Sequence, residues 1–183
     1  MNYVTYGYPY HYYHQHHHHH PYYTNVPMHY WNYWGYYHPH MGREMREFND
    51  QGKQPFVVNI NEASKQNNTF RTAIWTGTHL QVTLMSLQPG EDIGLEIHPD
   101  VDQFLRVEQG NGIVQMGKNK NQLDFVRQIA DDSAIIIPAG YWHNLTNTGN
   151  VPIKLYSIYA PPNHPFGTVH KTKAAAMEAE HEH

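Results

Sequence analysis

The sequence predicts an all-β domain, a small barrel or sandwich of short strands, with a disordered segment before it and a short helix after it. Three observations lead to this prediction. Short apolar and β-branched runs recur through residues 54–160, and turn-forming residues separate them. Residues 1–41 contain no Lys, Arg, Asp or Glu and few aliphatic residues. Residues 171–182 are rich in alanine and other good helix formers.

The expected strands follow one another at short intervals. In chain order they cover residues 54–60, 70–75, 80–87, 93–98, 103–109, 113–116, 123–129, 134–137, 142–147 and 153–160. Gly77 lies between the second and third and predicts a hairpin. Gly110, Asn111 and Gly112 predict a tight hairpin after residue 109. Pro138 and Gly140 end the β-branched run 134–137, because proline cannot donate within a central ladder.

Composition divides the chain into three parts. Residues 1–42 are expected to be a disordered Tyr/His-rich tail, because they lack the aliphatic surface that would offset the entropy of ordering them. Residues 43–170 have the length of one ordinary domain. Residues 171–183 are expected to form a helical or frayed tail. Residues 43–48 are a second, weaker helical candidate. Residues 161–167 are too apolar and rigid for a free tail and are expected to pack across the barrel or against a second subunit.

Three interpretations of the Tyr/His-rich tail remain open. It is a flexible segment without a specific task, or a segment that self-associates or anchors the protein in an assembly, or a metal buffer built on the histidines of residues 16–20. Its composition is similar to that of bacterial spore-coat proteins. We therefore expect a cytoplasmic or spore-coat location.

Charge and composition exclude several classes of partner. The net charge is −4 and there is no basic run, which argues against nucleic acid. The sequence has no apolar stretch that could span a membrane or serve as a secretory signal. It has no cysteine, so the fold uses no disulfide and any bound metal has oxygen and nitrogen ligands.

Two spaced motifs contain the candidate metal ligands. Glu96 and His98 are two residues apart, so on a strand their side chains share one face. The motifs read Gly90-x5-Glu96-x-His98-x4-Gln103-x6-Gly110 and Asp132-x5-Pro138-x-Gly140-x2-His143-x3-Asn147. If the barrel closes, Glu96, His98, Gln103 and His143 can converge in its interior.

These motifs resemble those of the cupin superfamily over roughly residues 56–162. The resemblance implies a cupin-type β-barrel, also called a double-stranded β-helix or jelly roll, and commonly a homodimer. By position, Glu96 stands at the place of the family's first histidine, and His98 matches the second. Gln103 stands at the place of the family's glutamate, and His143 matches the third histidine. Asp132 replaces a glycine at the start of the second motif.

The expected ligand set is therefore two imidazoles, a carboxylate and an amide oxygen. Such a set suits a divalent cation, with Mn, Fe, Zn, Ni and Co all open. Asp102 is an alternative to Gln103 as the fourth ligand, although strand alternation points the two side chains to opposite faces. A second interpretation also stays open, in which these polar groups are merely interior and hydrogen-bonded to one another.

Three functions follow as alternatives. The first is a metal-binding barrel that serves as a binding or assembly component. The second, by resemblance to mannose-6-phosphate isomerase-like cupins, is isomerisation of a sugar or sugar phosphate. The third is a metal-dependent dioxygenase. Glu96 is the candidate base in an enzyme, and the substrate would be a small molecule. No cluster of Arg and Lys is expected inside the barrel, because alternation from an inward Gln103 points Arg106 away.

Overall fold

The structure is a computed structural model that describes residues 48–181. The Tyr/His-rich tail expected at residues 1–42 and most of the helical candidate at 43–48 lie outside the described residues. Phe48 itself is not helical.

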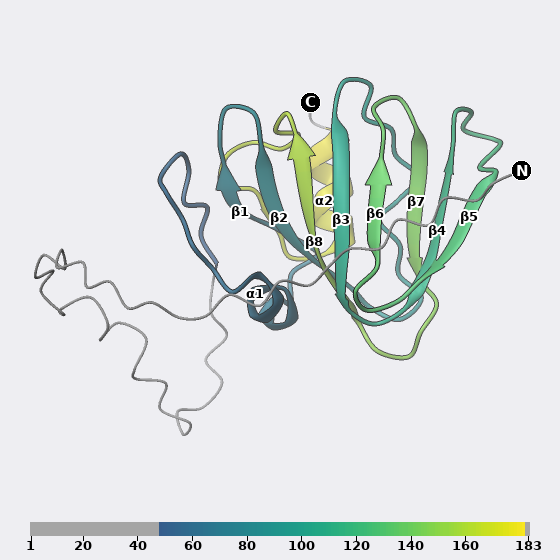
Figure 1. Ribbon diagram of the computed structural model, residues 1–183, viewed down its shortest axis with the longest axis horizontal. Helices are drawn as coiled ribbons and strands as arrows, with labels where there is room; N and C mark the ends of the chain where they lie inside the picture. Colours follow the sequence, from purple (N-terminus) through teal and green to yellow (C-terminus); the bar gives the residue numbers. More distant parts are fainter. Residues whose placement is uncertain (1–47, 182–183) are drawn as a thin grey trace, which may run out of the picture. The chain divides into compact units, whose positions relative to one another are not determined.

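Two antiparallel sheets make up the described domain (Figure 1). A six-stranded sheet has the order β6-β3-β8-β2-β1-β9, and a three-stranded sheet has the order β5-β4-β7. The elements are α1 (Ile60–Gln66), β1 (Arg71–Thr76), β2 (Gln81–Leu87), β3 (Asp102–Gln109), β4 (Gly112–Gly117), β5 (Phe125–Ile129), β6 (Ala134–Ile137), β7 (Trp142–Asn147), β8 (Ile153–Ala160), β9 (Val169–His170) and α2 (Lys173–His181). The predicted all-β fold with a short C-terminal helix is confirmed.

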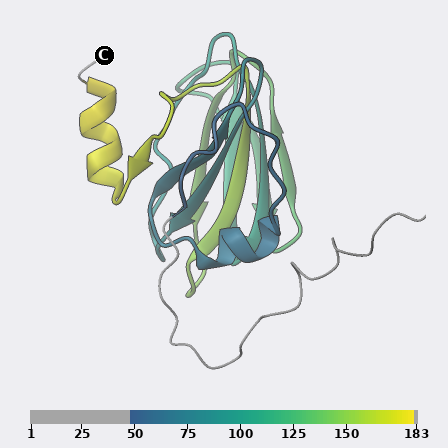
Figure 2. The ribbon, with the colours of Figure 1, turned by 90° about the vertical axis from the view of Figure 1, so that its left-hand side faces the viewer.

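The apolar core lies between the two sheets. Leu105 on β3 and Leu155 on β8 are fully buried, and they share one apolar cluster with Leu145 on β7 of the other sheet. Ala176 of α2 joins the same cluster. Figure 2 shows the strands edge-on, with α1 at one end of them. Because the inner faces of both sheets meet here, side chains from strands far apart in sequence become neighbours.

Strand prediction was wrong in two places. Residues 54–60 form no strand; the chain instead begins helix α1 at Ile60, with Asn59 as its N-cap accepting from the Glu62 backbone N–H at 3.2 Å. Asn59 and Glu62 are the helix-start signature that sequence reasoning missed. Residues 93–98 form only an isolated bridge at Glu96 rather than a continuous strand. The remaining predicted strands are present, with ends shifted by up to two residues.

The hairpin expected at residues 110–112 is also wrong. β3 lies in the six-stranded sheet and β4 in the three-stranded sheet, so the chain passes from one sheet to the other at Gly110. Gly110 has a φ of 89°, which disfavours other residues, and a Cβ there would lie 3.0 Å from the Ile153 Cα. The glycines therefore mark a close crossing between layers. The hairpin predicted around Gly77 is confirmed, since β1 pairs with β2.

Helix α2 covers most of the helical region predicted for residues 171–182. None of the helices among residues 48–181 is long and apolar enough to cross a membrane.

The segment 161–167 packs against the barrel, as expected, and one buried glutamine fastens it. The Gln81 side chain donates to the His164 carbonyl at 2.9 Å and accepts from the His164 N–H at 2.9 Å and the Asn163 N–H at 3.3 Å. It also donates to the Thr76 hydroxyl at 2.9 Å. The N–H and the oxygen of the Gln81 amide therefore both hold the backbone of His164 beside the barrel interior.

Replacing Gln81 by leucine is expected to destabilise the protein by about 2–4 kcal/mol, because several buried backbone groups lose their partner at once. Urea denaturation measures this loss. The matched control Gln88→Leu, at an exposed position directly after β2, is expected to change stability by less than about 0.5 kcal/mol. Equal effects of the two changes would show that the fastening contributes nothing.

Candidate metal centre

Backbone hydrogen bonds between the two motifs hold the residues of the site together. Glu96 and His98 lie on the segment between β2 and β3, and His143 lies on β7. The Glu96 N–H donates to the His143 carbonyl at 3.1 Å, and the His143 N–H donates to the Glu96 carbonyl at 2.9 Å. The Gly140 N–H donates to the His98 carbonyl at 2.8 Å. The backbone of the first motif is therefore bonded directly to that of the second.

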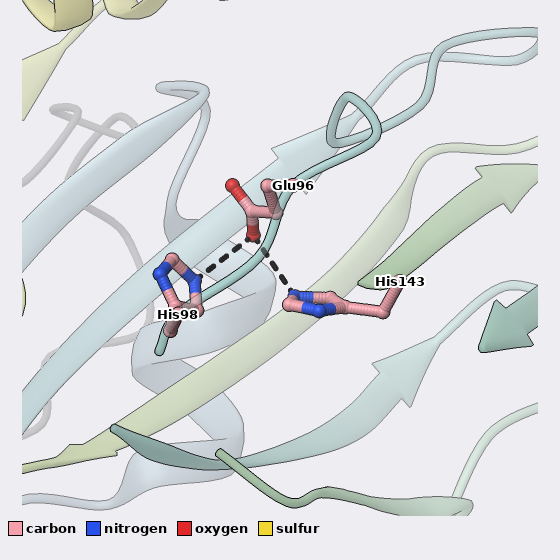
Figure 3. Close-up of side chains that lie close together, drawn as sticks. All are labelled: Glu96, His98 and His143. Carbon is pink, nitrogen blue, oxygen red and sulfur yellow. Dashed lines mark hydrogen bonds and ion pairs between the residues drawn. The ribbon is translucent and has the colours of Figure 1, made fainter. Parts of the chain in front are cut away.

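The three side chains converge on one point (Figure 3). Glu96 Oε1 lies 3.2 Å from His143 Nε2 and 3.4 Å from His98 Nε2. One ligand atom from each residue lies within 4.8 Å of the others. Ligand–metal bonds of about 2.0–2.2 Å place such atoms at similar separations, so the cluster can hold a metal ion.

The hydrogen bonding of His143 indicates that a cation lies between its ring and the Glu96 carboxylate. Its Nδ1 is 3.0 Å from the Tyr141 carbonyl oxygen, which can only accept, so Nδ1 carries a proton. In a neutral imidazole the other nitrogen, Nε2, then presents a lone pair toward the Glu96 carboxylate. Two acceptors 3.2 Å apart are compatible only if a cation is shared, either a proton on the imidazole or a metal ion. A backbone carbonyl that fixes the tautomer in this way is a usual second contact of metal-binding histidines.

His98 adds an independent observation. Its Nε2 is buried and has no hydrogen-bond partner in good geometry among the described residues. Buried polar atoms without a partner are rare in proteins and need an explanation. Imidazole and carboxylate donors of this kind fit a borderline divalent cation.

Arg71 lies beside the cluster, where no arginine was expected. Its guanidinium is 1% exposed and lies 4.0 Å from Glu96 Oε2. Burial alone raises the pKa of Glu96, but the adjacent His143 and His98 side chains and the charge of Arg71 outweigh it, holding the pKa well below its usual range. Glu96 is therefore a carboxylate at neutral pH. The residue types from Phe70 to Trp75 do not indicate which face of the strand turns inward. The sequence therefore did not predict that Arg71 lies at the site.

The depressed pKa of Glu96 predicts an acid-dependent stability. Above pH 4.5, the ordinary glutamate value, the metal-free protein has the full stabilisation from this carboxylate, and it loses that stabilisation as pH falls toward the lower folded-state pKa. Unfolding in urea with chelator present, between pH 6 and pH 3, measures the slope. Glu96→Gln is expected to flatten the slope, whereas Glu178→Gln on the exposed face of α2 leaves it unchanged. Parallel curves for wild type and Glu96→Gln would contradict the assignment.

The two candidates for the fourth ligand point in different directions. Gln103 is 2% exposed, and its side-chain N–H donates to the Ser157 hydroxyl at 3.0 Å, while its Oε1 has no partner among the described residues. Asp102 is exposed and accepts from the Ala139 N–H at 2.8 Å. The alternation argument that favoured Gln103 over Asp102 as the inward residue is therefore confirmed, although ligation by Gln103 stays a prediction.

Two further rings border the cluster. Tyr159 lies edge-on to His98 with ring centroids 5.7 Å apart, and His164 lies edge-on to Tyr159 at 5.0 Å. Burial, together with the charge of Arg71, lowers the pKa of His164 to about 3, so this imidazole is neutral near pH 7. The sequence signalled Tyr159 only through its place on an apolar strand. Arg106 lies on the outer side, paired with Glu108 and Asp132, as alternation predicted.

Comparison with known proteins agrees with this architecture. Residues 83–159 match the family described as Cupin domain. The chain is 62% identical to the uncharacterized protein YrkC of Bacillus subtilis (strain 168) over 174 residues, which cover 87% of this chain and 94% of that protein. It is 45% identical to the uncharacterized protein L612 of Acanthamoeba polyphaga mimivirus over 117 residues, 63% of this chain and 71% of that protein.

Solved structures show the same fold. The crystal structure of BH2720 from Bacillus halodurans is 66% identical, has a TM-score of 0.71, and covers 71% of this chain and 98% of its own. A Klebsiella pneumoniae protein with a double-stranded β-helix domain, 20% identical with a TM-score of 0.51, covers 64% of this chain and 98% of its own. At that identity the likeness concerns the fold alone.

Proposed function

This chain belongs to the cupin domain proteins, and from that premise we propose that its barrel binds a divalent cation through Glu96, His98 and His143. The observation that carries the proposal is that hydrogen-bond acceptor atoms of Glu96, His98 and His143 lie close together. Glu96 Oε1 faces the Nε2 atoms of both imidazoles, and the bond from Nδ1 of His143 to a backbone carbonyl leaves its Nε2 available as a ligand. A shared divalent cation satisfies all three groups at once.

Gln103 is the proposed fourth group at this centre. Its free amide oxygen lies on the inner face of β3, and an amide oxygen is a neutral and weaker ligand than a carboxylate. It either completes the coordination or orients a water bound to the ion. Three strong ligands leave positions open for a small molecule, which is the arrangement of a site that binds substrate rather than a closed structural site.

Metal titration of the full chain tests the proposal. After dialysis against chelator, the protein is expected to regain one tightly held equivalent of Mn, Fe, Co, Ni or Zn in the barrel. Calorimetry in buffers of different ionisation enthalpy is expected to detect proton release, because the metal displaces the proton shared by His143 and Glu96. Binding with no released proton and no dependence on His98 or His143 would contradict the proposal.

Isomerisation of a sugar phosphate is a second candidate, favoured by one observation. The buried guanidinium of Arg71 lies next to the cluster and attracts an anionic substrate. A divalent cation there would polarise hydroxyl and carbonyl oxygens of the open-chain sugar, and Glu96 is the candidate base. A coupled assay with mannose 6-phosphate tests this candidate, and no turnover above the His143→Ala background would dismiss it.

An assembly role is supported by the exposed edge of the three-stranded sheet. Among the strands of residues 48–181, β5 pairs with β4 alone, and Phe125, Val126, Arg127 and Gln128 are all exposed. An open edge with exposed apolar residues is a template for pairing with a second strand. We propose that a homodimer forms here. The role proposed for the tail, self-association in an assembly such as a spore coat, concerns residues outside the described part.

Val126→Lys is expected to convert the dimer to a monomer, because a charge on an edge strand opposes pairing. Sedimentation velocity of the full chain measures the mass of the particle. Val151→Lys, at an exposed valine in the loop between β7 and β8, is the matched control and is expected to remain dimeric. A monomeric wild type, or a dimeric Val126→Lys variant, would contradict the β5 interface.

A further inference from the structure

We infer that the barrel interior next to the metal centre holds a small carboxylate that also carries a hydroxyl or carbonyl oxygen. This inference rests on the proposed cation site and names the class of ligand that the open positions would accept. Two observations carry it: a wall of buried polar atoms that are not fully hydrogen-bonded, and a buried guanidinium beside that wall.

The polar wall is formed by three neighbouring strands. Gln103 on β3 pairs with Tyr159 on β8, and Ser157, two residues before Tyr159, pairs with Thr83 on β2. Residues paired across neighbouring strands, and residues two apart on one strand, share a face. Leu105, which pairs with Ser157 and belongs to the core between the sheets, identifies this face as the inner one. The polar side chains therefore face the interior.

The polar atoms of this wall are almost completely buried, because Gln103, Tyr159 and Thr83 are at most 2% exposed. Oε1 of Gln103 has no hydrogen-bond partner among the described residues. The Tyr159 hydroxyl interacts with the Ser157 and Thr83 hydroxyls, in a geometry too poor to satisfy either Tyr159 or Thr83. Buried polar atoms that are not fully bonded, on adjoining strands, indicate a ligand that offers hydrogen-bonding groups. A purely apolar ligand would leave the Gln103 oxygen unsatisfied.

The wall adjoins the proposed ligands. The Tyr159 ring is 5.7 Å from the His98 ring, which in turn is 5.4 Å from the His143 ring, centroid to centroid. The phenol hydroxyl of Tyr159 is a hydrogen-bond donor as well as an acceptor. A ligand bound to the cation thus lies within reach of a neutral donor.

Arg71 selects the charge of the ligand. Its positive charge acts on Glu96, Tyr159 and His164, the groups that border this interior. A guanidinium is a planar fork whose N–H pairs match the two oxygens of a carboxylate. A phosphate monoester carries more charge and is usually met by several cationic groups, whereas the described residues on the inner face of β1 provide this one guanidinium. This single guanidinium therefore favours a carboxylate over the phosphate of the second candidate function.

Three probes of nearly equal size test the inference by calorimetry on the full chain loaded with Mn²⁺. Lactate has the carboxylate and the hydroxyl, lactamide replaces the carboxylate by a neutral amide, and propionate lacks the hydroxyl. Lactate is expected to bind at least about tenfold more tightly than either of the other two, the difference that one well-formed charged or polar contact makes. Equal binding of lactate and lactamide would overturn the inference, as would tighter binding of mannose 6-phosphate than of lactate.

Two variants with matched controls localise the effect. Tyr159→Phe and Arg71→Lys are each expected to weaken lactate binding by about tenfold while the bound Mn²⁺ remains. Tyr156→Phe, also on β8, and Arg127→Lys, on exposed β5, are expected to bind lactate as the wild type does. If Arg71→Lys does not fold, the Tyr159 pair decides alone, and an unchanged lactate affinity in Tyr159→Phe counts against the inference. A wild-type chain that takes up no Mn²⁺ would refute the metal site itself, whereas a loaded chain that ignores lactate would refute this inference only.

Discussion

Replacing both His98 and His143 by alanine is expected to lower the affinity of the barrel for its divalent cation by more than about a hundredfold, since changing even a residue that only hydrogen-bonds to a metal ligand costs about tenfold to a hundredfold. Each histidine supplies one of three converging ligand atoms, and the remaining Glu96 carboxylate then has no imidazole nitrogen beside it to share a cation. Competition with a coloured chelator measures the affinity. The thermal stabilisation that the metal gives to the wild type is expected to disappear as well, because a ligand stabilises only the state that binds it.

The control for this experiment is His79→Ala. His79 is exposed in the loop between β1 and β2, remote in sequence from both motifs. The full chain also contains the histidines of residues 16–20, which are present in every variant and therefore cancel in the comparison. A metal affinity that falls equally in His79→Ala and in the double variant would mean that surface histidines, and not the barrel, account for the binding.

The second large effect concerns the fold that supports the site. Ile135 and Ile136 are neighbours on β6, but Ile135 is 3% exposed and belongs to the core, whereas Ile136 is 69% exposed. Ile135→Ala is expected to cost about 2–5 kcal/mol, since it removes buried methylene groups and leaves a cavity. Ile136→Ala is expected to change stability by less than about 0.5 kcal/mol.

Equilibrium unfolding in guanidinium measures both variants in the presence of chelator, so that metal binding does not contribute. The pair tests the register in which Leu105 on β3 lies opposite Ile135 on β6. If Ile136→Ala were the more damaging change, β6 would have the opposite face inward. The inward orientation of Gln103 would then be contradicted as well, because Gln103 pairs with Ile137 in the same ladder.

Local patterns were sufficient for the strands that form the core. The run 134–137 and the segments 142–147 and 153–160 were predicted with the ends that the structure has. The run 134–137 is uniformly apolar and is followed by Pro138, so local and tertiary preferences agree there. The region before Arg71 was harder. Residues 54–60 look extended, but the Asn59 cap starts a helix there, and capping outweighs a short apolar run.

Sequence reasoning selected the three residues that converge in the structure, Glu96, His98 and His143, but it did not find their surroundings. Spacing placed Glu96 and His98 together, and alternation separated Gln103 from Asp102. Arg71 could not be found in this way, because its position depends on which face of β1 turns inward. A bulge between Ala73 and Trp75 changes the register of that strand against β2. Alternation of residue types along one strand indicates which side chains share a face. It does not indicate which residues of the two sheets come into contact.

We propose that side chains from the two motifs share one cation. Anomalous diffraction from crystals of the full chain grown with Mn²⁺ or Zn²⁺ tests this proposal. We expect one strong anomalous peak bonded to Glu96, His98 and His143, with the Nδ1 of His143 still on the Tyr141 carbonyl. A barrel without such a peak, in which Glu96 and His143 keep their direct contact at saturating metal, would contradict it.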